Sequence, residues 1–581
     1  MSWEINSRKN AMDMRRLMLS FVFLSVCINS YAQNLEAIMR LEGVTVPEEV
    51  DSYEVERLQD LMRNPIDINA AGVGRLQECG LFSSFQTAAI LDYRSRHGAI
   101  MSLAELAALD GFTTSVTEVL APFVVLGEGI REEKNSWSCE GAMRGGFKSE
   151  ESEDPSWTYG IKCRAGFSDA VSTSLSVTCP YDELSARPSL LSGNFLWRYS
   201  YGKVLVGDFN ARFGQGLGLW NTMTYGGLSS PSAFMRKPSG ISASYSFTGT
   251  SALTGIAADC ILGRWKISSL IALPGIKDVK KHPEKLLLQP VVNIMRIGTY
   301  GHFSITQSVS FSNLKGRNFR IPQMRTSGDV SYCMRGVNLF GEFAFECVEP
   351  CVAFVVGTDF RTEEYLRHAT LLRYNPFANE HGLAYSGEYQ RKRHRVTYAV
   401  DCLYHPESKV KDGSVCCQAK AQIDWSLDFY EGFSLRMRLV ERLRTWGVAC
   451  RSDIRADVCY KSGRWVADIR LNIVNGVGTG ILGYLEGGYV MDGLSAYVRY
   501  GMFASDNWND RIYVYERDAP GGFNVPAYHG RGLWGAAYAS WKFCRWGRIY
   551  VRASLISYPF MRGDEKKPGR AELRVQTVFR L

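Results

Sequence analysis

His302 and Ser304 have the spacing of a hydrolytic pair on a β-strand. Residues two apart on a strand share a face, because strand side chains alternate between two faces. A serine activated by a histidine is a nucleophile, which would make the chain an acyl hydrolase if a third group oriented the histidine. No orienting group is identifiable in the sequence. The hydrolase is therefore a remote alternative, and we expect no catalytic residues.

Metal and cofactor chemistry has no supporting pattern. The histidines are scattered and none forms the HExxH metal spacing. Of the 15 cysteines, those after Cys27 form no CxxC pairs with downstream partners, which predicts no zinc or cluster site. Cys347 and Cys351 are the best local candidates for a disulfide. The alternative, which we favour, is that most cysteines are small apolar residues on strand faces.

Residues 1–32 have the three parts of a secretory signal peptide. Arg15 and Arg16 precede the short apolar run 17–28. The small residues Ser30 and Ala32 then stand at the −3 and −1 positions of a predicted cut before Gln33. The natural start is either Met1 or Met14. No run of about 18 apolar residues follows, so no transmembrane helix is predicted.

Charge divides the rest of the chain into two unlike parts. Residues 33–126 contain six arginines, no lysine and fourteen carboxylates, a net charge of −8, whereas residues 127–581 carry +14. Such a split predicts two environments. The charged, glycine-containing stretch 127–136 is the predicted linker. The basic part would attract the acidic part or an anionic solute.

The acidic part is predicted to be helical. A lead-in, 33–64, carries a helical pattern over 35–63 with Val55 and Leu58 on one face. Four short helices are expected in 65–126. The first covers 70–78 with an Asn69 cap, and the second covers 84–96. The third helix begins at the capping box 102–105 and ends at Gly111. The fourth begins at the capping box 115–118 and ends at Pro122.

Three stretches of this part, 64–71, 91–98 and 102–106, carry a family resemblance. They resemble the tandem helix-hairpin-helix domain of competence-type DNA receptors. They are more similar still to the N-terminal domain of Bacteroidetes helix-hairpin-helix outer-membrane proteins. The resemblance implies a tandem helix-hairpin-helix domain over 65–126, followed by an outer-membrane barrel. It implies no particular activity.

The two hairpins depart from the DNA-binding pattern of that family. In DNA-binding members of the family, each hairpin has the sequence Gly-hydrophobic-Gly. The second glycine lets backbone N–H groups approach a phosphate. Here the hairpins are Gly80-Leu81-Phe82 and Gly111-Phe112-Thr113. The Phe82 side chain would obstruct a phosphate, whereas the Thr113 hydroxyl can cap a helix or bond an anion. Residues 65–126 also contain three arginines and six acids, which disfavours nucleic acid.

Residues 137–581 are predicted to form a large antiparallel transmembrane β-barrel. Side chains alternate with period two along 241–248, 494–503 and 571–581, and turn-like clusters lie at 149–155, 405–413 and 563–569. The abundance of 55 Gly, 29 Tyr and 29 Phe at a mean hydropathy of −0.14 suits a barrel with one apolar and one polar face. About 18–24 strands are expected, in an even number. Soluble β-sandwiches are the alternative.

A glycine-rich stretch of this region resembles a segment that recurs in the same Bacteroidetes family. Residues 379–382 and Arg236, with the serine-rich strand after it, also resemble recurring segments of that family. It contains Gly207, Asp208, Gly214, Gln215, Gly216 and Leu217. No strand-turn-helix unit surrounds it, so it is not a dinucleotide fingerprint. We expect a tight bend or close backbone approach at a strand end or in an inward-folded loop.

Together these features predict a non-enzymatic outer-membrane β-barrel, either a pore or an anchor, without cofactor or metal. The helical module is expected in the periplasm, where it contacts a protein partner or the barrel itself; the other contact of the chain is outer-membrane lipid. Two alternatives remain: a DNA-uptake receptor that uses the hairpins, and the outer-membrane acyl hydrolase.

Overall fold

The computed structural model describes residues 31–127 and 137–581, apart from gaps at 152, 169, 182–189, 222–226, 248–251, 274–287, 312–322, 411–412, 431 and 562–566. The predicted signal peptide, except for its last two residues, and nearly all of the predicted linker lie outside the described residues. Within the described ranges, no helix is long and apolar enough to cross a bilayer.

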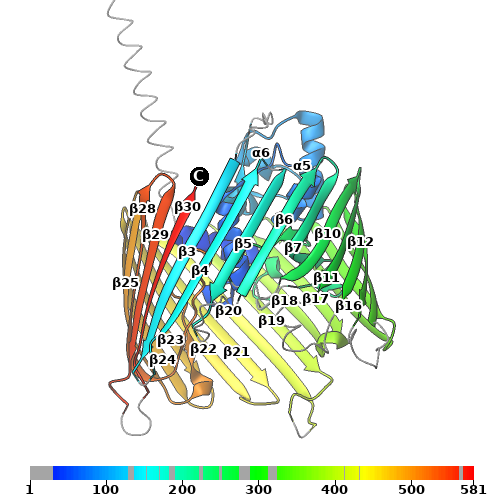
Figure 1. Cartoon of the computed structure of the whole chain (residues 1–581). Helices are drawn as coiled ribbons and strands as arrows, with labels where there is room; N and C mark the ends of the chain where they lie inside the picture. Colours follow the sequence, from blue (N-terminus) through cyan, green and yellow to red (C-terminus); the bar gives the residue numbers. More distant parts are fainter. Residues whose placement is uncertain are drawn as a thin grey trace, which may run out of the picture.

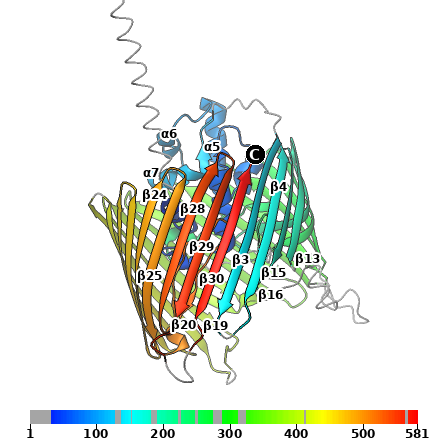
Figure 2. The same cartoon turned by 60° about the vertical axis from the view of Figure 1, so that its left-hand side comes forward.

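A closed antiparallel barrel forms most of the molecule (Figures 1 and 2). One 26-stranded sheet closes on itself where β3 (Trp137–Glu150) pairs with β30 (Arg570–Arg580). Two of its strands, β8 (Leu219–Trp220) and β9 (Gly240–Ala243), are short and pair with β7, so 24 of the 26 described strands build the wall. The even number and the upper end of the predicted range are confirmed.

The remaining wall strands follow one another around the barrel in chain order. They are β4 (Ser156–Phe167), β5 (Val171–Cys179), β6 (Leu190–Tyr199), β7 (Gly202–Phe213), β10 (Leu253–Leu262), β11 (Trp265–Leu273), β12 (Gln289–Ile297), β13 (Gly301–Ser310), β14 (Gln323–Met334), β15 (Val337–Glu346), β16 (Cys351–Glu363), β17 (Leu366–Asn375), β18 (Glu380–Arg391), β19 (His394–His405), β20 (Cys416–Tyr430), β21 (Phe433–Arg444), β22 (Cys450–Ser462), β23 (Trp465–Asn475), β24 (Thr479–Met491), β25 (Leu494–Ser505), β28 (Gly530–Cys544) and β29 (Gly547–Ser557).

The alternation along the wall strands separates an apolar outside from a polar inside. In β25, Val498 and Tyr500 are exposed while Arg499 between them is buried, and in β30 Leu573 is exposed while Glu572 is buried. Exposed large apolar side chains come from strands all around the wall. An outer surface of this kind suits hydrocarbon, and charged side chains must then face the lumen. The period-two alternation predicted for both strands is confirmed.

The two ends of the barrel differ in the length of their connections. At the end where β30 finishes and β3 begins, successive wall strands are joined by two or three residues, such as Arg335–Gly336 and Lys392–Arg393. We call this the short-turn end. At the opposite, long-loop end, the connections run from the 3 residues 476–478 to the 39 residues 214–252. Outer-membrane barrels show the same asymmetry, with short periplasmic turns and longer outer loops.

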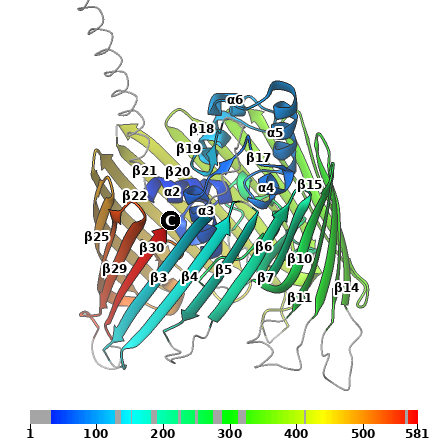
Figure 3. The same cartoon turned by 45° about the horizontal axis from the view of Figure 1, so that its top comes forward.

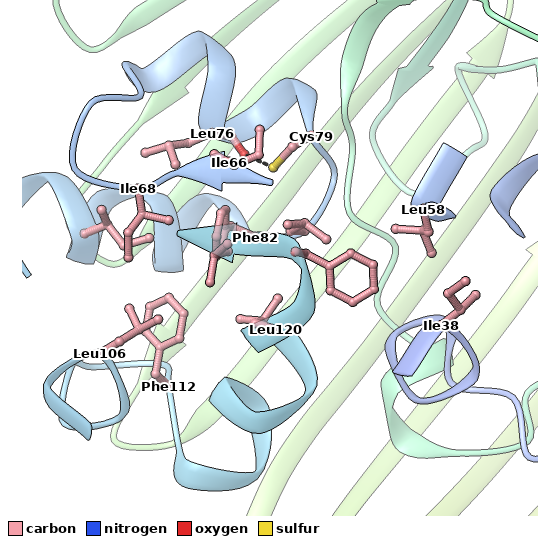
Figure 4. Packing of buried hydrophobic residues seen from close by; sticks show 14 of the residues in the cluster. Ile38, Leu58, Ile66, Ile68, Leu76, Cys79, Phe82, Leu106, Phe112 and Leu120 are labelled. Atoms are coloured by element: carbon pink, nitrogen blue, oxygen red, sulfur yellow. Dashed lines mark hydrogen bonds between the residues drawn. The ribbon is translucent and has the colours of Figure 1, made fainter. Parts of the chain in front are cut away.

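The N-terminal module, residues 33–126, packs around its own apolar core (Figure 4). Its elements are α2 (Tyr31–Glu42), η1 (Pro47–Glu49), α3 (Ser52–Arg63), α4 (Val73–Glu78), α5 (Ser84–His97), α6 (Leu103–Ala107), α7 (Thr114–Leu120) and η2 (Ala121–Phe123), with the parallel pair β1 (Ile66–Asp67) and β2 (Val124–Val125). Of the described residues in or packed against this core, Phe523 alone comes from outside the module. The apolar side chains of the module are therefore buried almost entirely against one another.

Several predicted helix starts are wrong. The predicted helix over 35–63 is divided, because Gly43 takes a positive φ of 71° and Asp51 caps a new helix through Tyr53 and Glu54. Asn69 caps nothing; its amide bonds the backbone of Ile100 instead, and α4 begins later, after Gly72.

The last two helices fit the predicted caps unequally. Ser102 accepts from the Glu105 N–H as expected, but the Glu105 carboxylate bonds Met101 N. Thr113, rather than Ser115, caps α7.

The module lies within the barrel, towards the short-turn end (Figure 3). Two segments from the long-loop end fold inward to meet it. One is segment 214–246, described at 214–221 and 227–246, which includes η3 (Pro231–Ala233), and the other is 511–528, which includes β26 (Ile512–Tyr513) and β27 (Ala527–Tyr528). The prediction that 241–248 is a two-faced wall strand is wrong. Residues 241, 244, 246 and 247 are all buried, because residues 241–247 lie inside the lumen; Thr248 lies outside the described residues. Two short helices, η5 (Pro376–Ala378) and η6 (Trp508–Asp510), lie at the long-loop end.

The outward face of β25 gives a test of the membrane wall. Replacing Val498, near the middle of the strand, by arginine should cost about 2–4 kcal/mol of unfolding free energy in lipid vesicles. The same substitution at Val337, the first residue of β15 at the short-turn end, should cost about 0–1 kcal/mol. Denaturant unfolding in vesicles measures both. Equal costs at the two depths would contradict the placement of the wall in hydrocarbon.

Candidate functional site: the filled barrel lumen

The interface between the module and the barrel is built from opposite charges. Within the described residues, seven module carboxylates pair with ten lysines and arginines of the wall. The carboxylates are Glu36, Glu48, Glu49, Glu54, Glu56, Asp60 and Glu78, and the cations come from β4, β6, β7, β20, β21, β22 and β23. The module is thus held from both sides of the lumen.

Glu48 and Glu49 bind one side of the wall. The Glu48 carboxylate lies 2.9 Å from Arg455 and 2.7 Å from Arg470, and it accepts the Tyr515 N–H at 3.0 Å. These contacts place η1 against β22 and β23, and they also hold the inward segment 511–528. Glu49 meets Arg438 at 2.5 Å on the neighbouring strand β21.

Residues of α3 bind the opposite side. Glu56 lies 2.7 Å from Lys162 on β4, and both side chains are almost fully buried. One turn later, Asp60 accepts two hydrogen bonds of 2.9 Å from the Arg164 guanidinium. Glu54 pairs with Arg212 of β7. Glu56 and Asp60, one turn apart, face β4, whereas Glu54 lies on another side of α3 and faces β7. Glu56 also accepts a hydrogen bond from the Ser246 hydroxyl of segment 214–246.

Burial and arginine act against each other on these carboxylates. Burial alone raises the pKa of Glu49, but Arg438 and Lys420 outweigh it and lower the pKa to about 2. Glu54 follows the same balance, with Arg212 and Arg57 lowering its pKa to about 2 against burial. Burial raises the pKa of Glu42 to about 7, and the neighbouring Glu54 adds to this effect. Glu49 and Glu54 therefore stay charged at neutral pH.

The glycine-rich stretch predicted at 207–217 forms two separate features. Gly207 and Asp208 lie in the wall, where Asp208 accepts the Gly193 N–H at 2.8 Å. Residues 214–218 turn into the lumen and wrap a buried carboxylate, that of Glu342 on β15. It accepts N–H groups of Gln215 at 2.7 Å, Leu217 at 2.9 Å and Gly218 at 2.9 Å.

Glycine is required in this turn. Gly214 has a φ of +62°, and a Cβ there would lie 2.6 Å from the Glu342 carboxyl carbon. The expectation of an inward-folded loop with close backbone approach describes what is found.

The predicted hairpin residues fall into a buried and a surface group. Leu81, Phe82 and Phe112 are buried in the module core, where the two phenylalanine rings meet edge to face. Gly80 and Gly111 turn the chain with positive φ. The hydroxyl of Thr113 caps α7 and also accepts from Arg361 of β16 at 3.3 Å. The apolar hairpin side chains are therefore not available to a nucleic acid.

His302 and Ser304 point into the lumen but do not form a hydrolytic pair. Both bond the carboxylate of Asp329, His302 at 2.5 Å and Ser304 through its hydroxyl. The serine hydroxyl thus donates its hydrogen bond to the aspartate rather than to the histidine, whereas nucleophile activation needs a direct serine–histidine bond. Sequence reasoning missed Asp329, which lies on the neighbouring strand. The cluster is buried and gives the hydrolase alternative no support.

Cysteine and metal chemistry is equally unsupported in the described chain. Cys347 and Cys351 are free thiols, so the candidate disulfide between them is wrong. No group of three or more His, Cys, Asp or Glu side chains among the described residues is arranged to hold a metal ion.

Comparisons with known proteins concern the fold alone. No protein-family model and no curated protein matches the chain. The siderophore receptor PirA from Pseudomonas aeruginosa is 7% identical over 77% of this chain and 81% of its own, with a TM-score of 0.43. The FrpB iron transporter from Neisseria meningitidis is 9% identical over 79% and 83%, with a TM-score of 0.37. OccK5 from P. aeruginosa is 9% identical over 77% and 98%, with a TM-score of 0.26. Identities and scores this low do not transfer a ligand to this chain.

The Glu48 pairs give the first test of the module's attachment. Glu48→Gln leaves Arg455 and Arg470 without this carboxylate, and removing one partner of a buried pair costs about 3–5 kcal/mol. We expect the lower end, because Asp457 still pairs with both arginines. Hydrogen exchange of module amides in the folded protein measures the loss. The matched control is Asp92→Asn at an exposed pair, where about 0–1 kcal/mol is expected; similar losses would refute the argument.

Acid gives the second test. A carboxylate with a lowered pKa stabilises the folded state above its unfolded value and loses that contribution as pH falls through its folded value. For Glu49 and Glu54 this window runs from 4.5 down to about 2. Glu42 has the opposite effect, because its pKa is raised to about 7: it lowers the stability of the folded state as pH rises above 4.5. The protection factors of the module amides, which correct for the pH dependence of intrinsic exchange, should therefore fall ahead of those of the wall strands between pH 4.5 and 2. Loss of both parts together would contradict this order.

Proposed function

We propose that the chain is an outer-membrane pore for anionic solutes, closed by its own N-terminal module. The observation that carries the proposal is the set of ion pairs across the lumen. The module fills the lumen with carboxylates, and the wall that it covers is rich in arginine and lysine. When the module is displaced, these cations face water and attract anions.

A polar interface supports a plug that can move. The apolar core of the module is almost entirely its own, whereas its contacts with the wall are mostly charged or hydrogen-bonded. Interfaces between parts of a chain that move relative to one another are typically more polar than permanent ones. Displacement therefore need not expose the module core, and a plug is favoured over a permanent anchor.

The location and orientation are part of the proposal. The apolar outer surface and the predicted secretory signal support the outer membrane, and the connection lengths support a periplasmic short-turn end. We also propose that α4 to α7, with positive-φ glycines in both hairpins, are the tandem helix-hairpin-helix domain of the family resemblance.

We propose that a periplasmic protein displaces the plug. Its docking point would be the face that carries Met101, which is 71% exposed at the start of α6.

Single-channel recording in planar bilayers tests the pore. Replacing Glu48, Glu49 and Glu54 by glutamine removes five contacts to wall cations and should give frequent openings that pass chloride in preference to potassium. The wild type and the Asp92→Asn control should stay mostly closed. Cation-selective openings, or a wild type as conductive as the triple variant, would overturn the proposal.

A further inference from the structure

A cavity of about 1200 Å³ lies between the module and the wall at the short-turn end. One side is formed by α2, α7 and both hairpins, including Ser83 and Thr113. The other side is formed by the ends of β14 to β19, and Lys237 of the inward segment 214–246 also lines it. This volume lies just above the range of about 300–1000 Å³ that is usual for small-ligand pockets, so the space can hold a small molecule with several functional groups.

The lining of this cavity carries more positive than negative charge. It contains eight arginines and lysines against five aspartates and glutamates. Two of the cations are already paired, Arg367 with Asp359 at 2.7 Å and Arg395 with Glu388 at 2.5 Å. Among the described residues, the other six have no carboxylate within the 4.0 Å of an ion pair. This contrasts with the rest of the lumen, where module carboxylates neutralise the wall.

Two of these six arginines are placed to hold an anion. Arg40 projects from α2, and its Nε is buried without a hydrogen-bond partner. Burial lowers the pKa of Arg40 and the neighbouring Arg395 lowers it further. Glu36, Glu388 and Glu118 offset this only in part, so an anion between the two arginines would relieve the remaining cost. Arg361, across the cavity on β16, bonds only the neutral Thr113 hydroxyl among the described side chains. Guanidinium groups bind phosphate and carboxylate through paired hydrogen bonds.

We infer that this cavity is a binding site for a small polyanion carrying phosphate or carboxylate groups, held between Arg40 of the module and Arg361 of the wall. The inference goes beyond the proposed pore, because binding here requires no opening of the barrel. It assigns a role to the Thr113 hairpin that the sequence did not predict: this hairpin orients a wall arginine towards the ligand.

Titration calorimetry of the full-length protein in detergent tests the site, with pyrophosphate and citrate as probes at low salt. We expect saturable binding of at least one probe, weakened at least 10-fold in Arg40→Gln/Arg361→Gln. Arg531→Gln, at an exposed arginine of the long-loop end, is the matched control and should bind like the wild type. Preference for one probe identifies the group recognised.

A second variant guards against misfolding of the double variant. Thr114→Glu places a carboxylate at the exposed edge of the cavity without removing a buried contact, and it should also weaken binding, whereas Ser95→Glu on α5, outside the lining, should not. No saturable binding of either probe by the wild type, or equal weakening by the control variants, would overturn the inference.

Discussion

A charge removed from water needs an opposite charge beside it, and in this molecule that requirement joins the module to the barrel. The wall cannot place its arginines in hydrocarbon, so they point inward. Inside, they are too buried to be solvated freely, and the carboxylates of the module provide their partners. This pairing is already visible in the sequence as the opposite net charges of the two parts of the chain, −8 and +14.

The same constraint explains the inward segments. Tyr515 of segment 511–528 donates to Glu48, and Ser229 of segment 214–246 donates to Glu49, so each segment completes the hydrogen bonds of a carboxylate that the wall arginines already hold. Burying such pairs adds little net stability compared with apolar packing, but leaving one partner alone is costly. The network therefore fixes where the module sits more than it adds to the stability of the barrel.

Much of the barrel could be predicted from the sequence, because period-two alternation is local. Val498 and Leu573 face outward as their patterns indicate. The same alternation misled at 241–248, because side chains of both faces are buried among residues 241–247. A short pattern does not reveal whether water, lipid or protein covers each side. The segment 511–528 was missed entirely. A gap of 24 residues between two wall strands, containing Pro520, Gly521 and Gly522, was the available signal.

The lumen site could be predicted only in part from the sequence. Charge asymmetry predicts that the barrel attracts the module or an anionic solute, and the glycines at 214–218 indicate a close backbone approach. No local pattern pairs Glu56 with Lys162, which lie 106 residues apart, or Gly214 with Glu342. Those partners depend on how 24 strands close, which is a property of the whole wall rather than of any segment.

A double-mutant cycle between Glu56 and Lys162 tests the central claim most directly. These two side chains are buried, lie 2.7 Å apart and belong to the module and the wall respectively. If the module is seated in the lumen, the unfolding free energies of Glu56→Gln, Lys162→Gln and the double variant should reveal a coupling of about 0.5–3 kcal/mol. Additive effects would mean that the two residues do not meet, and the seated module would have to be abandoned.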